Sequence, residues 1–252
     1  MNFIAIIPSR FASTRLPGKP LLIINKKSMI ERVYSQVLKC NSITEICVAT
    51  DNQEIILEVK KFDGKAIFTS ESHTTGTERC HEAANKLGVS SNDVVLNIQG
   101  DEPFIDPQNI EKLIDIFKKN PGVKIASLVS KIKNEEELFN PNCPKVIINN
   151  DGKAIYFSRN TIPYLRDFPK EKWLLNNTFY KHIGIYAYRK DVLKSLVKLA
   201  QSSWEKAESL EQLRWLQNGF EIFVAEVQDN GISVDTEDDL KKANDYALKN
   251  QL

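Results

Sequence analysis

The first twenty residues place the strongest constraint on the fold of this chain. An apolar run of strand length, residues 3–8, opens into a loop that carries Arg10, Arg15 and Lys19 and no acidic residue. Ligands of open α/β sheets bind beyond the carboxyl ends of the strands, so a basic loop at this place favours an anion site. Arg and Lys bind phosphate oxygens through charge-assisted hydrogen bonds, and three such groups suit a triphosphate. The alternative is a basic loop that is only solvated.

The composition is that of an ordinary globular chain. Its 252 residues are 42% hydrophobic, enough for a substantial core. A formal net charge of +1 gives no reason to expect nucleic acid or an anionic membrane as a partner. The apolar start is too short for a signal sequence or a membrane span. The four cysteines form no Cys-x-x-Cys pair, so we expect reduced thiols in a cytoplasmic protein: Cys40, Cys47, Cys80 and Cys143.

Strand and helix patterns alternate along the first half of the chain. Apolar runs of strand length precede amphipathic stretches with helical spacing, which predicts βαβ units and a mostly parallel α/β sheet. The expected strands are residues 3–8, 46–50, 65–69, 93–100 and 124–130, and the expected helices begin near residues 28, 53, 77 and 107.

The pattern changes after residue 143. An Asp-Gly turn at 151–152 lies between two apolar runs, which predicts a hairpin, and residues 179–188 again have the pattern of a strand. We therefore expect residues 143–188 to form an antiparallel excursion, a subdomain at most, within a single domain of residues 1–252. Helices are predicted at 191–199 and 208–218, strands at 220–227 and 231–235, and a last helix after Thr236.

Two loops after predicted strands carry polar side chains that suit a nucleotide site. The loop 72–79 is rich in hydroxyls, and Gly76 permits close backbone approach at the start of a helix. Capping of that helix is an equally good explanation for Thr77. Asp101 follows the run 93–100 and can hold Mg²⁺ against phosphates, or it can cap the turn that follows.

Two further places near the end of the chain carry charged residues of interest. Asp235 comes just before the predicted cap of the last helix and is not needed for that cap, so it can face a site. Glu211 and Arg214 are three residues apart in a predicted helix, a spacing that favours a simple surface ion pair.

Seven stretches, taken together, carry a resemblance to a known family. They are residues 7–20 (IPSRFASTRLPGKP), 76–79 (GTER), 97–103 (NIQGDEP), 156–159 (YFSR), 181–186 (KHIGIY), 210–214 (LEQLR) and 234–236 (VDT). In these stretches the chain resembles the 3-deoxy-manno-octulosonate cytidylyltransferases, or CMP-Kdo synthetases, from end to end. The resemblance is specific, because related nucleotidyltransferases have a glycine-rich version of the first loop.

The resemblance implies a fold, an activity and an assembly. The fold would be a Rossmann-like, three-layer nucleotidyltransferase sheet. The activity would be transfer of cytidylate from CTP to the anomeric hydroxyl of the acid sugar Kdo, with release of pyrophosphate, for lipopolysaccharide biosynthesis. Mg²⁺ would be the cofactor, and the enzyme would be a cytoplasmic homodimer whose subunits touch through residues 143–188.

The same resemblance implies a role for each polar residue of these motifs. The implied catalytic residues are Arg10, Arg15, Lys19, Asp101 and Asp235, of which Asp101 and Asp235 would bind the metal. The implied nucleotide-binding residues are Arg10, Ser13, Arg15, Lys19, Thr74, Gly76, Thr77 and Arg79. The implied sugar-binding residues are Gln99, Arg159, His182, Tyr186 and Glu211. Physical chemistry agrees with this assignment, since fixed cations and Mg²⁺ neutralise the charge that develops on pyrophosphate.

The sequence leaves alternatives for the substrate and for catalysis. An 8-amino analogue of Kdo differs from Kdo by a single group, whereas the opening loop argues against a sialic acid. A nucleotide-binding module without catalysis is the other alternative, although such a module has little need of both Asp101 and Asp235. A P-loop kinase is excluded, because Ser13 stands where the pattern needs its first glycine and Pro20 follows the lysine.

Overall fold

Strands and helices alternate along the chain in the computed structural model, which describes residues 1–12, 16–228 and 231–252. The strands are β1 (Phe3–Ser9), β2 (Ile23–Ile24), β3 (Lys27–Ser28), β4 (Glu45–Thr50), β5 (Ala66–Phe68), β6 (Val94–Asn97), β7 (Ile125–Lys131), β8 (Lys145–Ile148), β9 (Ala154–Ser158), β10 (Tyr180–Arg189) and β11 (Phe223–Glu226). The α-helices are α1 (Met29–Val37), α2 (Gln53–Lys61), α3 (Gly76–Lys86), α4 (Pro107–Lys119), α5 (Glu135–Phe139), α6 (Trp173–Asn176), α7 (Lys190–Leu196), α8 (Ser203–Glu208), α9 (Gln212–Gln217) and α10 (Glu237–Lys249), with 3₁₀ turns η1 (Lys19–Leu21) and η2 (Lys170–Lys172). Within these ranges no helix is both long enough and apolar enough to cross a membrane.

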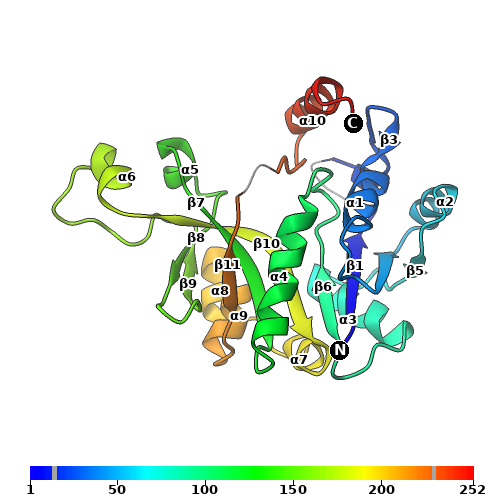
Figure 1. Ribbon diagram of the computed structural model, residues 1–252, viewed down its shortest axis with the longest axis horizontal. Helices are drawn as coiled ribbons and strands as arrows, with labels where there is room; N and C mark the ends of the chain where they lie inside the picture. Colours follow the sequence, from blue (N-terminus) through cyan, green and yellow to red (C-terminus); the bar gives the residue numbers. More distant parts are fainter. Residues whose placement is uncertain (13–15, 229–230) are drawn as a thin grey trace.

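Among the described residues, a nine-stranded sheet forms the centre of the molecule (Figure 1). Its order is β11-β7-β10-β6-β1-β4-β5, and the β8–β9 hairpin is attached to β10. β1 pairs in parallel with both β4 and β6, and β4 pairs in parallel with β5. The βαβ pattern predicted for the first half of the chain is therefore confirmed, and so is the mostly parallel α/β fold class.

Strand β10 is antiparallel to both of its neighbours, β6 and β7. The predicted excursion, residues 143–188, therefore ends in a strand at the centre of the sheet. It starts with the predicted hairpin, in which β8 and β9 pair around a turn where Gly152 has a φ of 74°, a conformation that suits glycine. Between β9 and β10, the segment with the short helix α6 projects at one end of the molecule's long axis (Figure 1).

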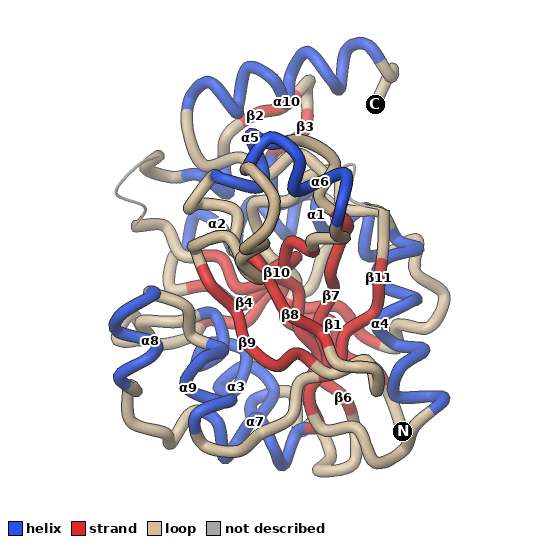
Figure 2. The backbone as a smooth tube through the Cα atoms, turned by 90° about the vertical axis from the view of Figure 1, so that its left-hand side faces the viewer, coloured by secondary structure: helices blue, strands red, loops and turns tan. Residues whose placement is uncertain are grey.

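Alternate strand residues bury two hydrophobic cores on opposite faces of the sheet. In β1, Phe3, Ala5 and Ile7 belong to the core that includes buried residues of α1, α2 and α4. Ile4 and Ile6 belong to the core with buried residues of α3, α7 and α9. Figure 2 shows α3, α7, α8 and α9 on one side of the strands and α4 on the other. Helices on both faces of the sheet give the three layers of an α/β fold.

The last helix, α10, packs in a small core of its own against the start of the chain. The buried members of this core are Leu16, Ile24, Met29, Phe104, Val234, Ala243 and Ala247. A strand was predicted at residues 231–235, and this prediction is wrong, because that segment is irregular. The N–H of Val234 instead donates to the carbonyl oxygen of Asp101 at 3.0 Å. This contact brings Asp235 beside the loop that follows β6.

Helix α3 begins at Gly76, with Thr75 as its N-cap. The Thr75 hydroxyl accepts from the N–H of Glu78, and the Glu78 carboxylate accepts from the N–H of Thr75, which is a capping box. Thr77 is therefore not the cap, and its hydroxyl donates to Glu211 at 2.8 Å. The spacing Thr-x-x-Glu fits Thr75 with Glu78, so the local sequence did hold the signal.

A buried ion pair joins α8 to α9, the helix that begins next to Glu211. The Nε and Nη2 atoms of Arg214 donate to the two carboxylate oxygens of Glu205 at 2.7 and 2.6 Å. The side chains of Arg214 and Glu205 are only 10% and 6% exposed. The expected surface pair of Arg214 with Glu211 is therefore wrong, since Arg214 turns to a helix that the sequence did not predict.

Replacing Arg214 by Met should lower the free energy of unfolding by about 3–5 kcal/mol, because the Glu205 carboxylate would stay buried without its partner. Urea unfolding followed by circular dichroism measures this change. Lys241→Met is the control, since Lys241 and Asp238 are 74% and 81% exposed and such a pair contributes about 0–1 kcal/mol. Equal losses in the two variants would contradict a stabilising role of burial.

Candidate active site

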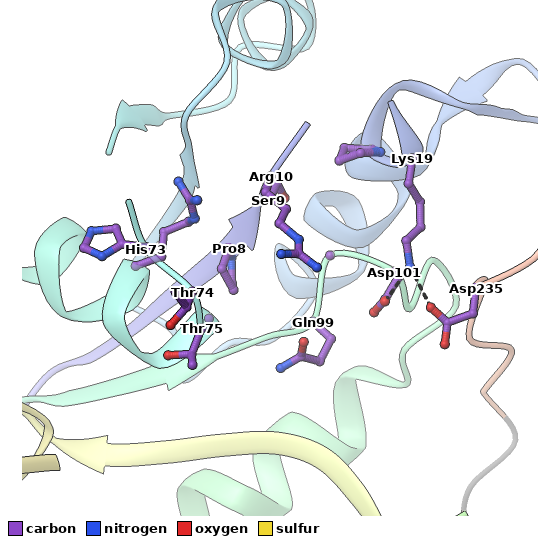
Figure 3. A pocket seen from close by; sticks show the side chains of 14 residues that line it. Pro8, Ser9, Arg10, Lys19, His73, Thr74, Thr75, Gln99, Asp101 and Asp235 are labelled. Atoms are coloured by element: carbon purple, nitrogen blue, oxygen red, sulfur yellow. Dashed lines mark hydrogen bonds and ion pairs between the residues drawn. The ribbon is translucent and has the colours of Figure 1, made fainter. Parts of the chain in front are cut away.

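An open cavity of about 290 Å³ lies beyond the carboxyl ends of β1 and β6 (Figure 3). At this place the order of the strands reverses, because β4 and β5 continue to one side of β1 while β6 lies on the other. Open α/β sheets bind their ligands at such a switch point. The lining residues are Pro8, Ser9, Arg10, Lys19, Pro20, His73, Thr74, Thr75, Gly76, Arg79, Gln99, Gly100, Asp101 and Asp235.

The loop after β1 contributes the cations of the cavity. Arg10 and Lys19, two of the four residues expected to hold the triphosphate, both line it, whereas Ser13 and Arg15 lie outside the described residues. The loop is closed by a hydrogen bond from the N–H of Gly18 to the carbonyl oxygen of Phe11 at 3.2 Å. Gly18 has a φ of 65°, so glycine is favoured at this turn.

Arg79 forms part of the cavity wall, but its guanidinium is already bound inside the protein. It donates from Nη1 to Thr69 Oγ1 at 2.7 Å and from Nη2 to Asp51 Oδ2 at 2.6 Å. The other oxygen of Asp51 accepts the N–H of Phe11 at 3.2 Å. The pair therefore ties helix α3 to the basic loop. Asp51 was not singled out from the sequence. It could have been found, because Asp51 directly follows β4 and site residues of such sheets lie just beyond the strand ends.

The amino end of α3 forms the wall opposite the basic loop. A Cβ atom on Gly76 would lie 3.3 Å from Pro8 Cγ and 3.4 Å from Asn97 Nδ2, so the helix and the strand ends approach closely here. The N–H and hydroxyl of Thr74 donate to Glu78 Oε2 at 2.8 and 3.1 Å. Of the residues expected to bind the nucleotide, Thr74 and Gly76 line the cavity, and Thr77 does not, because its side chain donates to Glu211.

Two carboxylates from distant parts of the chain meet at the far end of the cavity. Asp101 Oδ2 and Asp235 Oδ1 lie 2.8 and 2.9 Å from the ammonium nitrogen of Lys19, and the carbonyl oxygen of Val234 lies 3.0 Å from it. Burial opposes the charged form of Lys19, but the charge and hydrogen bond of Asp101, supported by Asp235, outweigh it and raise its pKa. The structure thus brings together the two aspartates singled out from the sequence.

The donor atoms around Lys19 fit Mg²⁺. They are two carboxylate oxygens and one carbonyl oxygen, the hard ligands this ion prefers, and they already surround one positive charge. No cluster of three or more His, Cys, Asp or Glu suited to a metal lies in the part of the chain that the structure describes. Two carboxylates agree with Mg²⁺, which commonly takes only one or two from the protein together with substrate phosphates.

The residues expected to bind the sugar lie around β10. Gln99 lines the cavity and donates from Nε2 to the carbonyl oxygen of Gly184 at 3.0 Å. His182 is on β10, with its Nε2 2.9 Å from Ser127 Oγ, and burial lowers its pKa to about 3. Its imidazole is therefore neutral at pH 7. The Tyr186 hydroxyl is buried and has no hydrogen-bond partner among the described residues.

Two other residues of this set are held by the protein itself. Burial raises the pKa of Glu211, whose carboxylate accepts the bond from Thr77. The guanidinium of Arg159 donates to three carbonyl oxygens, those of Glu208 at 2.6 Å, Pro141 at 3.0 Å and Ser209 at 3.3 Å. Of the five predicted sugar-binding residues, only Gln99 is among the residues that line the described cavity.

Gly100 lies against the end of β1, so Gly100→Ala should disturb the lining of the cavity. The added Cβ would lie 2.8 Å from Ser9 Oγ and 3.1 Å from the Pro8 carbonyl oxygen. We expect the free energy of unfolding to fall by about 1–3 kcal/mol, the usual cost of overpacking. Chemical unfolding measures it. Gly184→Ala, where a Cβ would meet nothing within 4 Å, is the matched control and should be nearly neutral; a neutral Gly100→Ala would contradict the close approach.

Comparison with known proteins gives a consistent result. Residues 4–224 match the model of the cytidylyltransferase family. A 3-deoxy-manno-octulosonate cytidylyltransferase of Cytophaga hutchinsonii is 52% identical over 241 residues, 95% of each chain. The enzyme of that name from Parabacteroides distasonis is 49% identical over 247 residues, 96% of this chain and 97% of the relative.

A solved structure resembles this one over its whole length. It is CMP:2-keto-3-deoxy-manno-octonic acid synthetase complexed with CTP, which is 39% identical, with a TM-score of 0.92, over 99% of this chain and 100% of that chain. Agreement in both sequence and structure leads to one conclusion: this chain belongs to the cytidylyltransferase family, in the group of the 3-deoxy-manno-octulosonate cytidylyltransferases.

Proposed function

We propose that this protein transfers cytidylate from CTP to Kdo, releasing pyrophosphate and forming CMP-Kdo for lipopolysaccharide biosynthesis. One observation carries the proposal: the cations Arg10 and Lys19 and the carboxylates Asp101 and Asp235 share one cavity at the switch point of the sheet. Phosphate oxygens need the cations, and the metal that accompanies a triphosphate needs the carboxylates. The full-length similarity to cytidylyltransferases of this name supports the choice of CTP and Kdo.

Each wall of the cavity takes one part of the substrates in this proposal. Arg10 and Lys19, with Ser13 and Arg15 from the same loop, hold the triphosphate. Thr74, Gly76 and Thr77 belong to the segment that lies against the nucleoside. Arg79, from the same segment, positions the basic loop after β1 through Asp51.

The sugar-binding group in this proposal comprises residues Gln99, Arg159, His182, Tyr186 and Glu211. Its buried hydroxyl and neutral imidazole supply hydrogen-bonding groups for a polyhydroxy acid.

Charge neutralisation is the main contribution of this chain to catalysis. Mg²⁺ held by Asp101 and Asp235 would supply positive charge against the phosphate oxygens. Arg10 and Lys19, which both line the cavity, stabilise the negative charge that grows on the leaving pyrophosphate. Gln99, the member of the sugar-binding group that lines the cavity, is oriented by its bond to the Gly184 carbonyl.

We further propose a homodimer that works in the cytoplasm. The segment between β9 and β10 exposes apolar side chains, with Tyr164 at 72% and Leu175 at 83%, as expected of a contact surface. The four cysteines are free thiols, which suits a reducing compartment.

An assay of pyrophosphate release with CTP, Mg²⁺ and a panel of acid sugars tests the function. We expect the highest kcat/KM with Kdo, a lower value with its 8-amino analogue, and little turnover with sialic acid, because the sugar-binding group must match the hydroxyls of one sugar. Turnover that favours sialic acid would contradict the choice of sugar. Tight CTP binding with no turnover of any sugar would instead indicate a binding module.

Asp101→Asn and Asp235→Asn should each lower kcat at least about 100-fold while CTP binding changes little. The reason is that the positive charge of the metal ion, which these carboxylates would hold, is needed most in the transition state. Steady-state kinetics and calorimetric CTP titration separate the two effects. Asp238→Asn is the matched control, since this exposed aspartate of α10 is outside the cavity lining. Unchanged pyrophosphate release in either site variant would refute the metal role.

A further inference from the structure

The ammonium group of Lys19 sits between the two carboxylates of the cavity. Its nitrogen lies within 3.0 Å of three oxygens, those of Asp101, Asp235 and the Val234 carbonyl. Figure 3 shows the Lys19 side chain extended toward Asp101 and Asp235, with dashed lines to both. The ammonium group therefore already occupies the set of hard oxygen donors that fits Mg²⁺.

A divalent cation and this ammonium need the same place. Mg²⁺ binds oxygen ligands at about 2.0–2.1 Å, so an ion shared by Asp101 and Asp235 would lie almost where the Lys19 nitrogen is. Two positive charges this close repel strongly, and the carboxylate oxygens cannot serve both fully. One of the two cations must leave when the other binds.

Such an exchange requires a movement of the Lys19 side chain. Its N–H donates to the carbonyl oxygen of Leu16 at 3.2 Å, and the turn before it is closed by the bond from Gly18 to Phe11. These bonds fix the backbone, whereas a lysine side chain is a flexible four-carbon stem with three rotatable donors. The ammonium can therefore turn toward the phosphate site while the Lys19 backbone stays in place.

We propose that Lys19 is an internal occupant of the metal site and exchanges with the divalent cation when CTP binds. In the nucleotide-free enzyme the ammonium keeps Asp101 and Asp235 together and competes with metal. When metal and triphosphate bind, the carboxylates pass to the metal and the ammonium passes to the phosphate oxygens. The inference rests on the proposed function and adds a source of cooperativity, because each ligand releases the protein group that the other one needs.

Binding of Mn²⁺ to the enzyme, measured by electron paramagnetic resonance with and without CTP, tests the exchange. Lys19→Met and Lys19→Gln should each raise the Mn²⁺ affinity of the nucleotide-free enzyme at least about tenfold, because the charged competitor is gone. The factor by which CTP increases Mn²⁺ affinity should be smaller in both variants than in the wild type. Two variants are used, with thermal unfolding as a check, so that poor folding of one does not decide the result.

Arg10→Met is the matched control, because it removes a charge of the same sign from the same cavity. This substitution should change the Mn²⁺ affinity of the nucleotide-free enzyme by no more than about twofold, since the Arg10 charge acts on the metal ion only through electrostatic repulsion that solvent and salt screen. An unchanged or lower affinity in the Lys19 variants, or an equal rise in Arg10→Met, would overturn the exchange. If the wild type makes CMP-Kdo and binds Mn²⁺ with CTP, such a result removes the exchange alone; a wild type that makes no CMP-Kdo contradicts the proposed function.

Discussion

The parallel pairing of β1 with β4 on one side and β6 on the other is the constraint on which the site depends. Parallel neighbours end at the same edge of a sheet, so the loops that follow them meet there whatever their separation along the chain. Lys19 and Asp101 are 82 positions apart in sequence, yet their charged atoms are 2.8 Å apart. The backbone hydrogen bonds between β1, β4 and β6 thus bring together the basic loop, Asp51 and Asp101, which follow these strands.

Features that rest on a local pattern could be predicted from the sequence. The apolar run of β1, the amphipathic spacing of α4 and the cap of α10 at Thr236 each carry their own signal, and the structure has all three. Arg10 and Asp101 could be found for the same reason, because each directly follows a strand that the pattern predicts. The roles assigned to them from the resemblance, however, come from the family motifs and not from local physics.

Features that depend on distant partners could not be predicted in the same way. Helix α8 has six residues and too little periodicity to be recognised from the sequence. Its residue Glu205 could therefore not be predicted as the partner of Arg214. The strand-like pattern of β10 was visible, but nothing in it indicates insertion between β6 and β7, which tertiary packing decides. Asp235 follows Val234, whose N–H donates to the Asp101 carbonyl, and this segment is irregular chain, where no repeating pattern exists to predict the contact.

The residues proposed to bind the sugar and those proposed to bind the triphosphate come from different parts of the sheet. His182 and Tyr186 of the sugar-binding group lie on β10, Arg159 follows β9 and Glu211 precedes α9, whereas the triphosphate is assigned to the loop after β1. The pairing of β1 with β4 and with β6 uses no residue of β9, β10 or α9. A protein that evolves from this scaffold could therefore accept another carboxylated sugar and still bind the same nucleotide. The part of the fold that carries β9, β10 and α9 is thus the natural target for redesign of the acceptor.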